Sequence, residues 1–294
     1  MSGDSAMDQI VFLNGQYLPL AEARIPVLDR GFIFGDGVYE VIPAYARRLF
    51  RLREHLARLD HSLRSIRLAN PFDAAGWQRL LESVVERNPW ADQSVYLQVT
   101  RGVAPRAQEF PKPAVAPTVF VMASPLKMPT PEQRARGVAV VTREDYRWQR
   151  CDIKSISLLA NCLLRQEAED AGAAETILIR DGKVKEASTC NVLLVKDGVI
   201  LSPPRDHLIL HGVTFDLALE LAREAGLPVC VREIARGELF AADEVWLTSS
   251  AREVLPVTAI DGQRIGDGRP GPAYARMYRL FQAYKARRAA PSDA

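Results

Sequence analysis

One lysine stands in the stretch of this sequence that offers the most chemistry. Lys154 follows the β-branched Ile153, and shortly after it residues 158–164 carry leucines at helical spacing. This pattern predicts that Lys154 lies at a strand-to-helix junction against a core, where burial favours the neutral, nucleophilic amine. Such an amine can form a Schiff base with an aldehyde cofactor. The alternative is a lysine whose amine reaches solvent or pairs with Asp152.

Three further stretches could approach or bind an anion. Residues 29–41 hold three glycines within seven positions before a strand-like run, which indicates either close approach to a ligand or a tight turn with positive φ. Arg58 borders the apolar stripe of a predicted helix, so its guanidinium could bind a phosphate or form a surface ion pair. A helix that begins at residues 212–214, with Thr214 as its predicted cap, would present free backbone N–H groups.

The elements that must position these residues fall into two groups. Asn14-Gly15 predicts a hairpin within residues 10–20, and Asp73 is the predicted cap of a helix. The other elements predicted in this half are a helix at 52–66 and strands at 94–101 and 117–123, joined by the loop 102–116. Three prolines in residues 125–131 are typical of a linker. We therefore predict a domain at 1–124, a linker at 125–131 and a second domain at 132–294 that carries Lys154.

The pattern of the second half also predicts both strands and helices. Asp181-Gly182 and residues 196–198 predict two successive hairpins. The other predicted elements are a strand at 138–142, a helix ending at Gly172, the helix from 212, strands at 228–233 and 244–247, and a terminal helix at 272–287. Both halves therefore predict an α/β (mixed α+β) protein.

Composition excludes several classes of function. The chain has 294 residues, 48% of them hydrophobic, and a formal net charge of +2 without a basic block, so no nucleic-acid partner is expected. Four widely spaced cysteines without a C-x-x-C pattern indicate neither a metal site nor a disulfide framework. Residues 1–9 lack a signal-peptide profile and no run of about 18 apolar residues occurs. We expect no membrane partner and a cytoplasmic location.

Four motifs together resemble one known family over nearly the whole chain. They are Arg30-Gly31-x-x-Phe34-Gly35-Asp36-Gly37-Val38-Tyr39-Glu40, Thr100-Arg101-Gly102 with Arg106, Arg147-Trp148-x-Arg150-Cys151-Asp152-Ile153-Lys154-Ser155, and Glu186-x-Ser188-x-x-Asn191. The chain resembles the class IV pyridoxal-phosphate-dependent aminotransferases, and among them the bacterial D-amino acid transaminases. The resemblance implies the two-domain fold of type IV pyridoxal-phosphate enzymes, with the cofactor in the interdomain cleft, and a homodimer.

The resemblance also implies roles for the cofactor-binding residues. Lys154 would hold pyridoxal 5'-phosphate as a Schiff base and then move the substrate α-proton as base and acid. Glu186 would face the pyridine nitrogen and keep it protonated, so that the ring can absorb electrons released at Cα. The phosphate would be bound by Arg58, Val213, Thr214, Ser249 and Ser250.

The substrate side depends on a second set of residues. Tyr39 and Arg106 would capture the α-carboxylate of the substrate, with Arg147 close to the same region. Gln108 stands where the D-amino acid transaminases have histidine, so this chain offers an uncharged amide at that position. Phe215 replaces an arginine of the relatives, and the sequence suggests no functional reason for this change.

The expected activity is transfer of an amino group from a D-amino acid, such as D-alanine, to a 2-oxo acid, such as 2-oxoglutarate. Branched-chain L-amino acid transaminases and 4-amino-4-deoxychorismate lyases share the fold, the lysine and the glutamate, so these activities are the alternatives. The loop that contains Arg106 is the feature that discriminates between these activities. A non-catalytic binding protein with the same fold is a further alternative, which the presence of both Lys154 and Glu186 disfavours.

Overall fold

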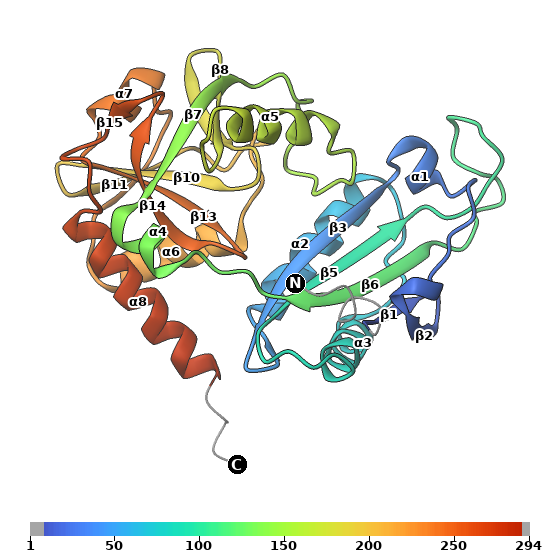
Figure 1. The fold of residues 1–294 in the computed structure, drawn as a ribbon. Coiled ribbons are helices and arrows are strands. Elements are labelled where there is room, and N and C mark those ends of the chain that lie inside the picture. The colour runs from blue at the N-terminus through green and yellow to red at the C-terminus, as the bar shows by residue number, and fades with distance from the viewer. Residues whose placement is uncertain (1–8, 290–294) are drawn as a thin grey trace. The chain divides into compact units, whose positions relative to one another are not determined.

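The computed structural model describes residues 9–289, which form two compact units (Figure 1). The first unit contains the chain up to Lys127 together with Ile153–Ser157, and the second contains the rest from Met128 onward. The change of unit at Lys127 falls inside the stretch 125–131 that the prolines predict to be a linker. Residues 1–8, most of the segment without a signal-peptide profile, lie outside the described residues.

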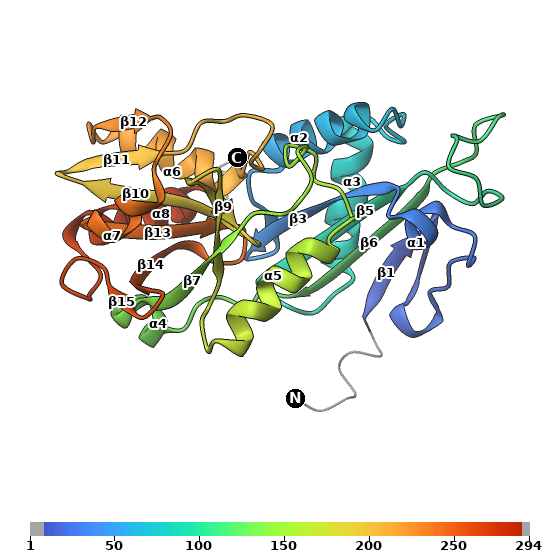
Figure 2. The same ribbon diagram turned by 90° about the horizontal axis from the view of Figure 1, so that it is seen from above.

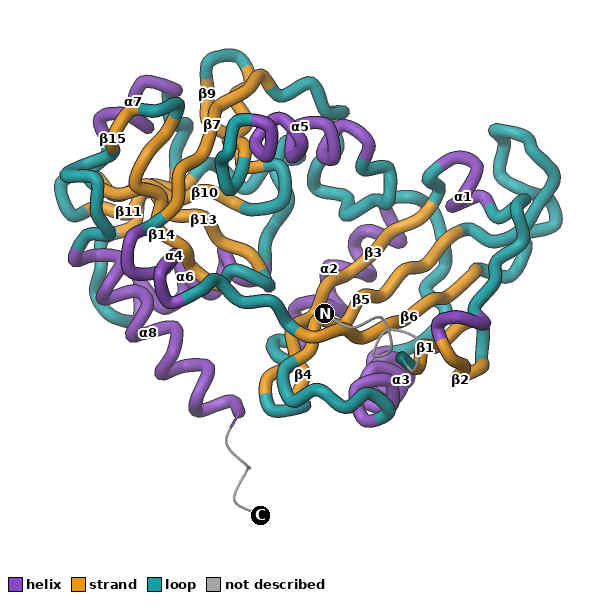
Figure 3. Tube along the Cα trace, in the orientation of Figure 1, coloured by secondary structure: helices purple, strands orange, loops and turns teal. Residues whose placement is uncertain are grey.

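An antiparallel sheet of six strands forms the centre of the first unit (Figure 3). Its strand order is β2-β1-β6-β5-β3-β4. The elements of this unit are β1 Ile10–Leu13, β2 Gln16–Pro19, the 3-10 helix Leu20–Glu22, α1 Arg30–Phe34, β3 Gly37–Tyr45, β4 Arg48–Leu49, α2 Leu52–Ser65, α3 Ala74–Glu86, β5 Gln93–Thr100 and β6 Thr118–Pro125. The predicted Asn14-Gly15 hairpin is confirmed, because both turn residues have positive φ.

Two helices cover one face of this sheet because each carries an apolar stripe. Leu59 and Leu63 of α2 and Leu81 of α3 are fully buried with the inward-facing valines and leucines of β3, β5 and β6. Asp73 caps α3 as predicted, since its carboxylate accepts a hydrogen bond from the Gly76 amide at 2.6 Å. Strands alternate their side chains, so Tyr39 and Glu40 of β3 point to opposite faces of the sheet.

The segment around Lys154 packs with the first unit, whereas the sequence placed it in the second domain. The Lys154 carbonyl accepts a hydrogen bond from the Tyr39 amide at 3.0 Å, and the Lys154 amide donates to Ser62 Oγ at 3.1 Å. Ser155 adds a bridge to Val38, so this short extended segment lies against β3 and α2. These long-range main-chain contacts are invisible in the local pattern, which shows only the connection to the following helix.

The helix after Lys154 differs from its prediction in position and in orientation. It is α5, Leu159–Asp170, which begins five residues beyond the lysine. Leu159 and Leu163 are 74% and 52% exposed, and only Leu164 of the predicted apolar set on this helix is fully buried. The expectation that all these leucines face a core is therefore wrong.

A mixed sheet forms the centre of the second unit (Figure 2). Its main path is β12-β11-β10-β13-β14-β7-β8-β9, and β15 pairs with β14. The elements are α4 Pro131–Arg136, β7 Val138–Glu144, α5 Leu159–Asp170, β8 Thr176–Arg180, β9 Lys183–Ala187, β10 Asn191–Lys196, β11 Val199–Ser202, α6 Val213–Glu224, β12 Val229–Val231, α7 Arg236–Ala241, β13 Glu244–Ser249, β14 Glu253–Ile260, β15 Gln263–Arg264 and α8 Pro272–Ala289. Both predicted hairpins, β8-β9 and β10-β11, are confirmed. In the part of the chain that is described, every helix is too short or too polar to cross a bilayer.

Candidate active site

Lys154 presents its amine to the ring of Tyr39. Its Nζ lies 4.2 Å from the centre of that ring, a distance at which an ammonium group is attracted to the aromatic face. Among the described residues of the first unit, this amine has no carboxylate partner within 4 Å. Asp152, the alternative partner considered from the sequence, instead accepts hydrogen bonds from Arg150 at 2.9 and 3.0 Å. The main-chain contacts to Tyr39 and Ser62 hold the lysine backbone in place.

Tyr39 is itself held by an aromatic row on the face of the first sheet opposite α2 and α3. Its ring stacks on Tyr96 with centres 5.7 Å apart, and the Tyr96 hydroxyl donates to Gln98 at 2.6 Å. Burial, together with the neighbouring Tyr39, raises the pKa of Tyr96 to about 12, so this phenol stays protonated at neutral pH. The row gives Tyr39 and Lys154 a rigid support on β3 and β5.

Arg58 is part of a buried ionic group on the helix-covered face of the same sheet. Its Nε and Nη2 donate to the two oxygens of Glu40, each at 2.8 Å, and His55 Nδ1 lies 2.8 Å from Glu40 Oε2. Burial alone would raise the pKa of Glu40, but Arg58 and His55 lower it to about 2. Burial lowers the pKa of His55. Glu40 therefore fixes the plane of the Arg58 guanidinium.

Glu186 is buried at the end of β9 and receives hydrogen bonds on both carboxylate oxygens. Arg147 Nη1 donates to Oε1 at 2.7 Å, while Asn191 Nδ2 and the Leu210 amide donate to Oε2 at 3.1 and 3.0 Å. Burial raises the pKa of Glu186, and the charge and hydrogen bonds of Arg147 only partly oppose this effect. The result is a carboxylate of fixed orientation in a poorly solvated place.

Arg147 is bound by carboxylates of the protein. Its Nε and Nη2 donate to the two oxygens of Asp145 at 2.9 and 3.0 Å, and its Nη1 donates to Glu186 Oε1. Burial would lower the pKa of Arg147, but Glu186 and Asp145 raise it above its usual value. Arg180 adds a further contact to Asp145 at 3.0 Å. All three guanidinium nitrogens of Arg147 thus contact protein carboxylates, although the resemblance associates this arginine with the substrate.

The beginning of α6 offers main-chain donors in the second unit. Its cap residue is Gly212, so the prediction that Thr214 caps the helix is wrong, and Val213 and Thr214 form the first turn. A Cβ on Gly212 would overlap the Asn191 side-chain oxygen, so this tight contact requires glycine. Asn191 also donates to the Leu210 carbonyl at 2.7 Å. One side chain therefore ties Glu186 to the segment that leads into α6.

Ser249 is the last residue of β13, and Ser250 follows it directly. Asn191 pairs with Thr248 in the register of β10 and β13, which places the serines one and two residues beyond that pair. Ser249 Oγ accepts a hydrogen bond from the Arg252 amide at 3.2 Å. Phe215, the departure noted in the sequence, is fully buried, and the structure suggests no functional reason for it.

Arg106 and Gln108 lie on the exposed loop between β5 and β6. The Arg106 guanidinium lies 5.5 Å from the centre of the Phe34 ring, and no carboxylate of the described residues pairs with it. Gln108 exposes its side chain, while its carbonyl accepts a hydrogen bond from Arg30 at 3.2 Å. This loop therefore presents an arginine whose charge is not neutralised by a neighbouring side chain.

The structure brings the sequence-predicted residues together in local groups. Tyr39 contacts Lys154 within the first unit, and Glu186 contacts Arg147 within the second. Sequence reasoning assigned no role to the supporting residues Glu40, His55, Asp145, Asn191 and Arg30, although three of them stand in the quoted motifs. Two signals could have revealed some of them: Asp145 stands two residues before Arg147, and Glu40 directly follows Tyr39 in a motif of the resemblance.

The donor chemistry of these groups fits pyridoxal 5'-phosphate. A phosphate needs several fixed donors, which the first turn of α6 and the hydroxyls of Ser249 and Ser250 can supply. The buried Thr248 hydroxyl has no hydrogen-bond partner among the described residues. A pyridinium nitrogen needs a buried, oriented carboxylate, as Glu186 is. An aldehyde needs an amine without an ionic partner, and Lys154 has none among the described residues of the first unit.

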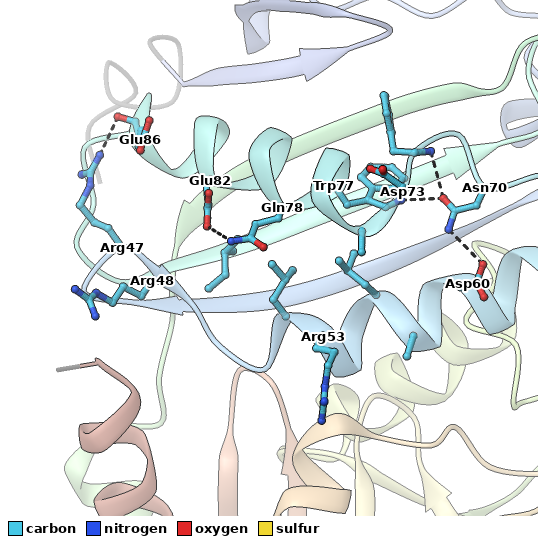
Figure 4. A pocket seen from close by; sticks show the side chains of 16 residues that line it. Arg47, Arg48, Arg53, Asp60, Asn70, Asp73, Trp77, Gln78, Glu82 and Glu86 are labelled. Atoms are coloured by element: carbon cyan, nitrogen blue, oxygen red, sulfur yellow. Dashed lines mark hydrogen bonds between the residues drawn. The ribbon is translucent and has the colours of Figure 1, made fainter. Parts of the chain in front are cut away.

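A cavity of the first unit is lined by a different set of residues (Figure 4). It has a volume of about 1050 Å³ and lies between α2 and α3, where Leu56 and Trp77 contribute to its apolar part. Asn70 on its wall accepts from Trp77 Nε1 at 2.8 Å and donates to Asp60. None of the predicted site residues lines this cavity.

Comparison with known proteins assigns the chain to a family. A sequence model of the family described as Amino-transferase class IV matches residues 37–260. A D-alanine aminotransferase of Bacillus licheniformis is 44% identical over 92% of this chain and 95% of its own, and one of Listeria monocytogenes is 38% identical over 92% and 94%. A branched-chain amino acid aminotransferase of Thermoproteus uzoniensis with norvaline has a TM-score of 0.84 at 26% identity, covering 97% of this chain and 96% of its own. The branched-chain amino acid aminotransferase of Escherichia coli has a TM-score of 0.85 at 26% sequence identity, covering 94% of this chain and 94% of its own. Together with the site, these matches show that the chain belongs to the class IV aminotransferases, which use pyridoxal phosphate.

Proposed function

We propose that this aminotransferase moves the amino group of a D-amino acid, such as D-alanine, to a 2-oxo acid, such as 2-oxoglutarate. The observation that carries the proposal is the 44% identity to a D-alanine aminotransferase over nearly the whole chain. The branched-chain aminotransferase structures reach 25–29% identity over a similar length. The uncompensated charge of Arg106 adds a group that can bind a substrate carboxylate.

Lys154 carries the covalent and proton-transfer roles in this proposal. Bound pyridoxal phosphate supplies an aldehyde for the amine and a ring that accepts the electrons released at Cα. Nζ of Lys154 takes the α-proton of the substrate and later returns it. The two main-chain hydrogen bonds to Tyr39 and Ser62 keep the lysine backbone in position during both transfers.

Glu186 stabilises the protonated pyridine nitrogen, and Arg147 acts through Glu186. Because Arg147, Asn191 and Leu210 donate to its two oxygens, the Glu186 carboxylate needs little reorientation when charge develops on the ring. Arg147 is therefore a positioning residue in this scheme, and its ion pair with Asp145 fixes its own plane.

The remaining predicted residues bind the two ends of the reactants. Arg58, held by Glu40, binds the phosphate with the amides of Val213 and Thr214 and the hydroxyls of Ser249 and Ser250. On the substrate side, Tyr39 and Arg106 bind the α-carboxylate and Gln108 donates an amide hydrogen bond.

The direct test compares two donors with one acceptor. Purified protein loaded with pyridoxal phosphate is incubated with D-alanine or with L-leucine, each with 2-oxoglutarate, and the products are quantified with resolution of their stereochemistry. We expect faster product formation from D-alanine. Faster reaction of L-leucine would replace the proposal with the branched-chain activity, which the structural similarity to branched-chain aminotransferases makes the second candidate.

Two variants test the assigned chemistry. Lys154→Ala should abolish turnover without unfolding the protein, and borohydride should attach the cofactor to residue 154 of the parent. Attachment to another lysine would refute this role. Glu186→Gln should lower kcat by about 10²- to 10³-fold while cofactor binding persists through the phosphate contacts. A variant with bound cofactor and parental kcat would remove the role of Glu186.

We further propose a cytoplasmic homodimer. Ile25, Val27 and Leu28 before α1 and Phe32 within it are exposed apolar side chains, with Phe32 70% exposed. Val103 is also exposed and forms a bridge with Asp29, so it lies beside this group. Such a cluster is typical of a contact surface between proteins. Sedimentation should give a dimer for the parent and a smaller species for Phe32→Asp.

A further inference from the structure

The loop that carries Arg106 is held from behind by a buried arginine of α1. Arg30 is 3% exposed, and its guanidinium donates to the carbonyls of Ala107, Gln108 and Glu109 at 2.5, 3.2 and 3.3 Å. Three consecutive carbonyls next to Arg106 therefore depend on one side chain. Charged donors form stronger hydrogen bonds than neutral ones, so this contact restrains the loop backbone.

Arg30 is itself fixed by an ion pair with Asp36. Its Nε donates to Asp36 at 2.8 Å, and Arg101 donates to the same carboxylate at 2.8 and 3.0 Å. Burial would raise the pKa of Asp36, but Arg101 and Arg30 lower it, so the carboxylate stays ionised between them. Arg101 also lies 3.7 Å from the centre of the Phe110 ring. The loop is thus attached both at residues 107–109 and at Phe110.

Phe34, at the last turn of α1, contacts Arg106 itself. The Arg106 guanidinium lies 5.5 Å from the centre of the Phe34 ring, and Arg30 lies 4.8 Å from the centre of the same ring. An arginine over an aromatic face keeps its hydrogen-bond donors available at the guanidinium edge. Phe34 therefore restricts the direction of Arg106 without neutralising its charge.

We propose that Arg30 and Phe34 are positioning residues that set substrate affinity by fixing the position and orientation of Arg106. This inference rests on the proposed role of Arg106 in binding the α-carboxylate. Arg30 fixes the loop backbone, and Phe34 fixes the side chain. Substrate then binds without the cost of ordering the loop, which is the usual benefit of a preorganised site.

The kinetic test replaces Arg30 with methionine, which keeps the apolar stem and removes the donors. Arg30→Met should raise KM for the amino acid by about 10- to 100-fold, with a smaller change in kcat and an unchanged cofactor absorption spectrum. Arg30→Lys should lie between the parent and Arg30→Met, because one amine cannot reproduce the planar set of donors. The matched control is Arg24→Met. Arg24 also donates to main-chain carbonyls, those of Ala21 and Ala23, but not to those of the loop.

Phe34→Leu separates the orientation of the Arg106 side chain from the anchoring of the loop backbone by Arg30. It should raise KM by only about 2- to 5-fold, the effect of one exposed cation–π contact. Arg24→Met should keep the parental KM. If Arg30→Met and Phe34→Leu both keep the parental KM for the amino acid, the proposal is overturned.

Limited proteolysis tests the anchoring without any substrate. Trypsin can cut after Arg106, whereas Lys112 is followed by a proline, which blocks cleavage there. We expect faster cleavage at Arg106 in holoenzyme of Arg30→Met than in the parent, Arg24→Met or Phe34→Leu. Equal cleavage in all four proteins would refute the anchor. A parent that does not convert D-amino acids but shows this cleavage pattern would contradict the proposed function and leave the anchor standing.

Discussion

Two arginines that the sequence assigns to the substrate region have opposite surroundings in the structure. Arg106 lies on an exposed loop, contacts the Phe34 ring, and has no carboxylate partner among the described residues. Arg147 is buried in the second unit, where Asp145 and Glu186 bind all three of its guanidinium nitrogens. The same residue type is thus available to a ligand in one region and occupied by the protein in the other.

The difference shows that the partners of a charge decide what the charge can do. A buried arginine that pairs with two carboxylates stabilises them and fixes their orientation, and removing it leaves uncompensated buried charge. A partly solvated arginine without a partner contributes little to folding but can recognise an anion. Variants at the two positions should therefore affect different measurements, which makes the comparison testable.

The largest expected effect is on stability, from Arg147→Met. This change leaves Asp145 and Glu186 buried with fewer donors, so the free energy of unfolding should fall by about 3–5 kcal/mol. Denaturant unfolding of the apoenzyme, followed by circular dichroism, measures it. Glu186→Gln removes one of the two charges that Arg147 compensates.

The double variant Arg147→Met/Glu186→Gln completes a mutant cycle for this prediction. Because its buried amide carries no charge, it should lose less stability than the sum of the two single variants. Additive losses would mean that Arg147 and Glu186 are not energetically coupled, despite their 2.7 Å contact.

The residue types at both positions could be predicted from the sequence, but their partners could not. Arg147, Glu186 and Lys154 stand in motifs that indicate the cofactor chemistry. The contact between Arg147 and Glu186 joins residues 39 positions apart, and the anchoring of Arg106 by Arg30 joins segments 77 to 79 positions apart. Such contacts depend on the tertiary fold, which local spacing does not contain.

The same distinction applies to the fold. The hairpin at Asn14-Gly15 and the helix capped by Asp73 were predictable because turn and cap chemistry acts over four or five residues. Strand β14 was missed because Pro256 interrupts its pattern, although Pro256 pairs with Trp246 in the sheet. Helix α1 was missed because it has only five residues and contains a glycine.

The next effect is on substrate binding, from Arg106→Ala. If Arg106 binds the α-carboxylate as proposed, the variant should lower kcat/KM for D-alanine, mainly through KM, by a factor that corresponds to about 2–5 kcal/mol, the cost of losing one partner of a desolvated charge pair. Unfolding should match the parent, in contrast to Arg147→Met. Steady-state kinetics on D-alanine, D-glutamate and L-leucine, paired with denaturant unfolding, measure both quantities. Unchanged KM for every amino acid would remove Arg106 from carboxylate binding.

A third prediction extends the comparison to the buried pair of Arg58 and Glu40. The pKa of Glu40 falls from 4.5 to about 2 on folding, so the ionised pair contributes roughly 3 kcal/mol of stability at neutral pH. Because the folded pKa is the lower one, this contribution is fully present above about pH 4.5. It declines as the pH falls through about 2.

Unfolding of the parent and of Glu40→Gln between pH 2 and 6 checks this window. The parent should be more stable near pH 6, and the difference should shrink as the pH falls below about 4.5. Arg58 and His55 are the charged and titratable groups that contact Glu40 directly. A difference that stays constant with pH would show that the Glu40 charge does not carry the stabilisation.

The smallest effect is expected on the same loop as Arg106, from Gln108→Ala. The Gln108 side chain is exposed, and its carbonyl, which the substitution retains, is what Arg30 binds. Loss of one neutral amide hydrogen bond to the substrate should therefore cost about 0.5–1.5 kcal/mol in kcat/KM. Gln108→His adds a ring that can be charged, so its KM should fall as the pH is lowered through about 6.5. If Gln108→Ala instead weakens D-alanine binding as much as Arg106→Ala does, recognition depends on the loop as a unit rather than on its single uncompensated charge.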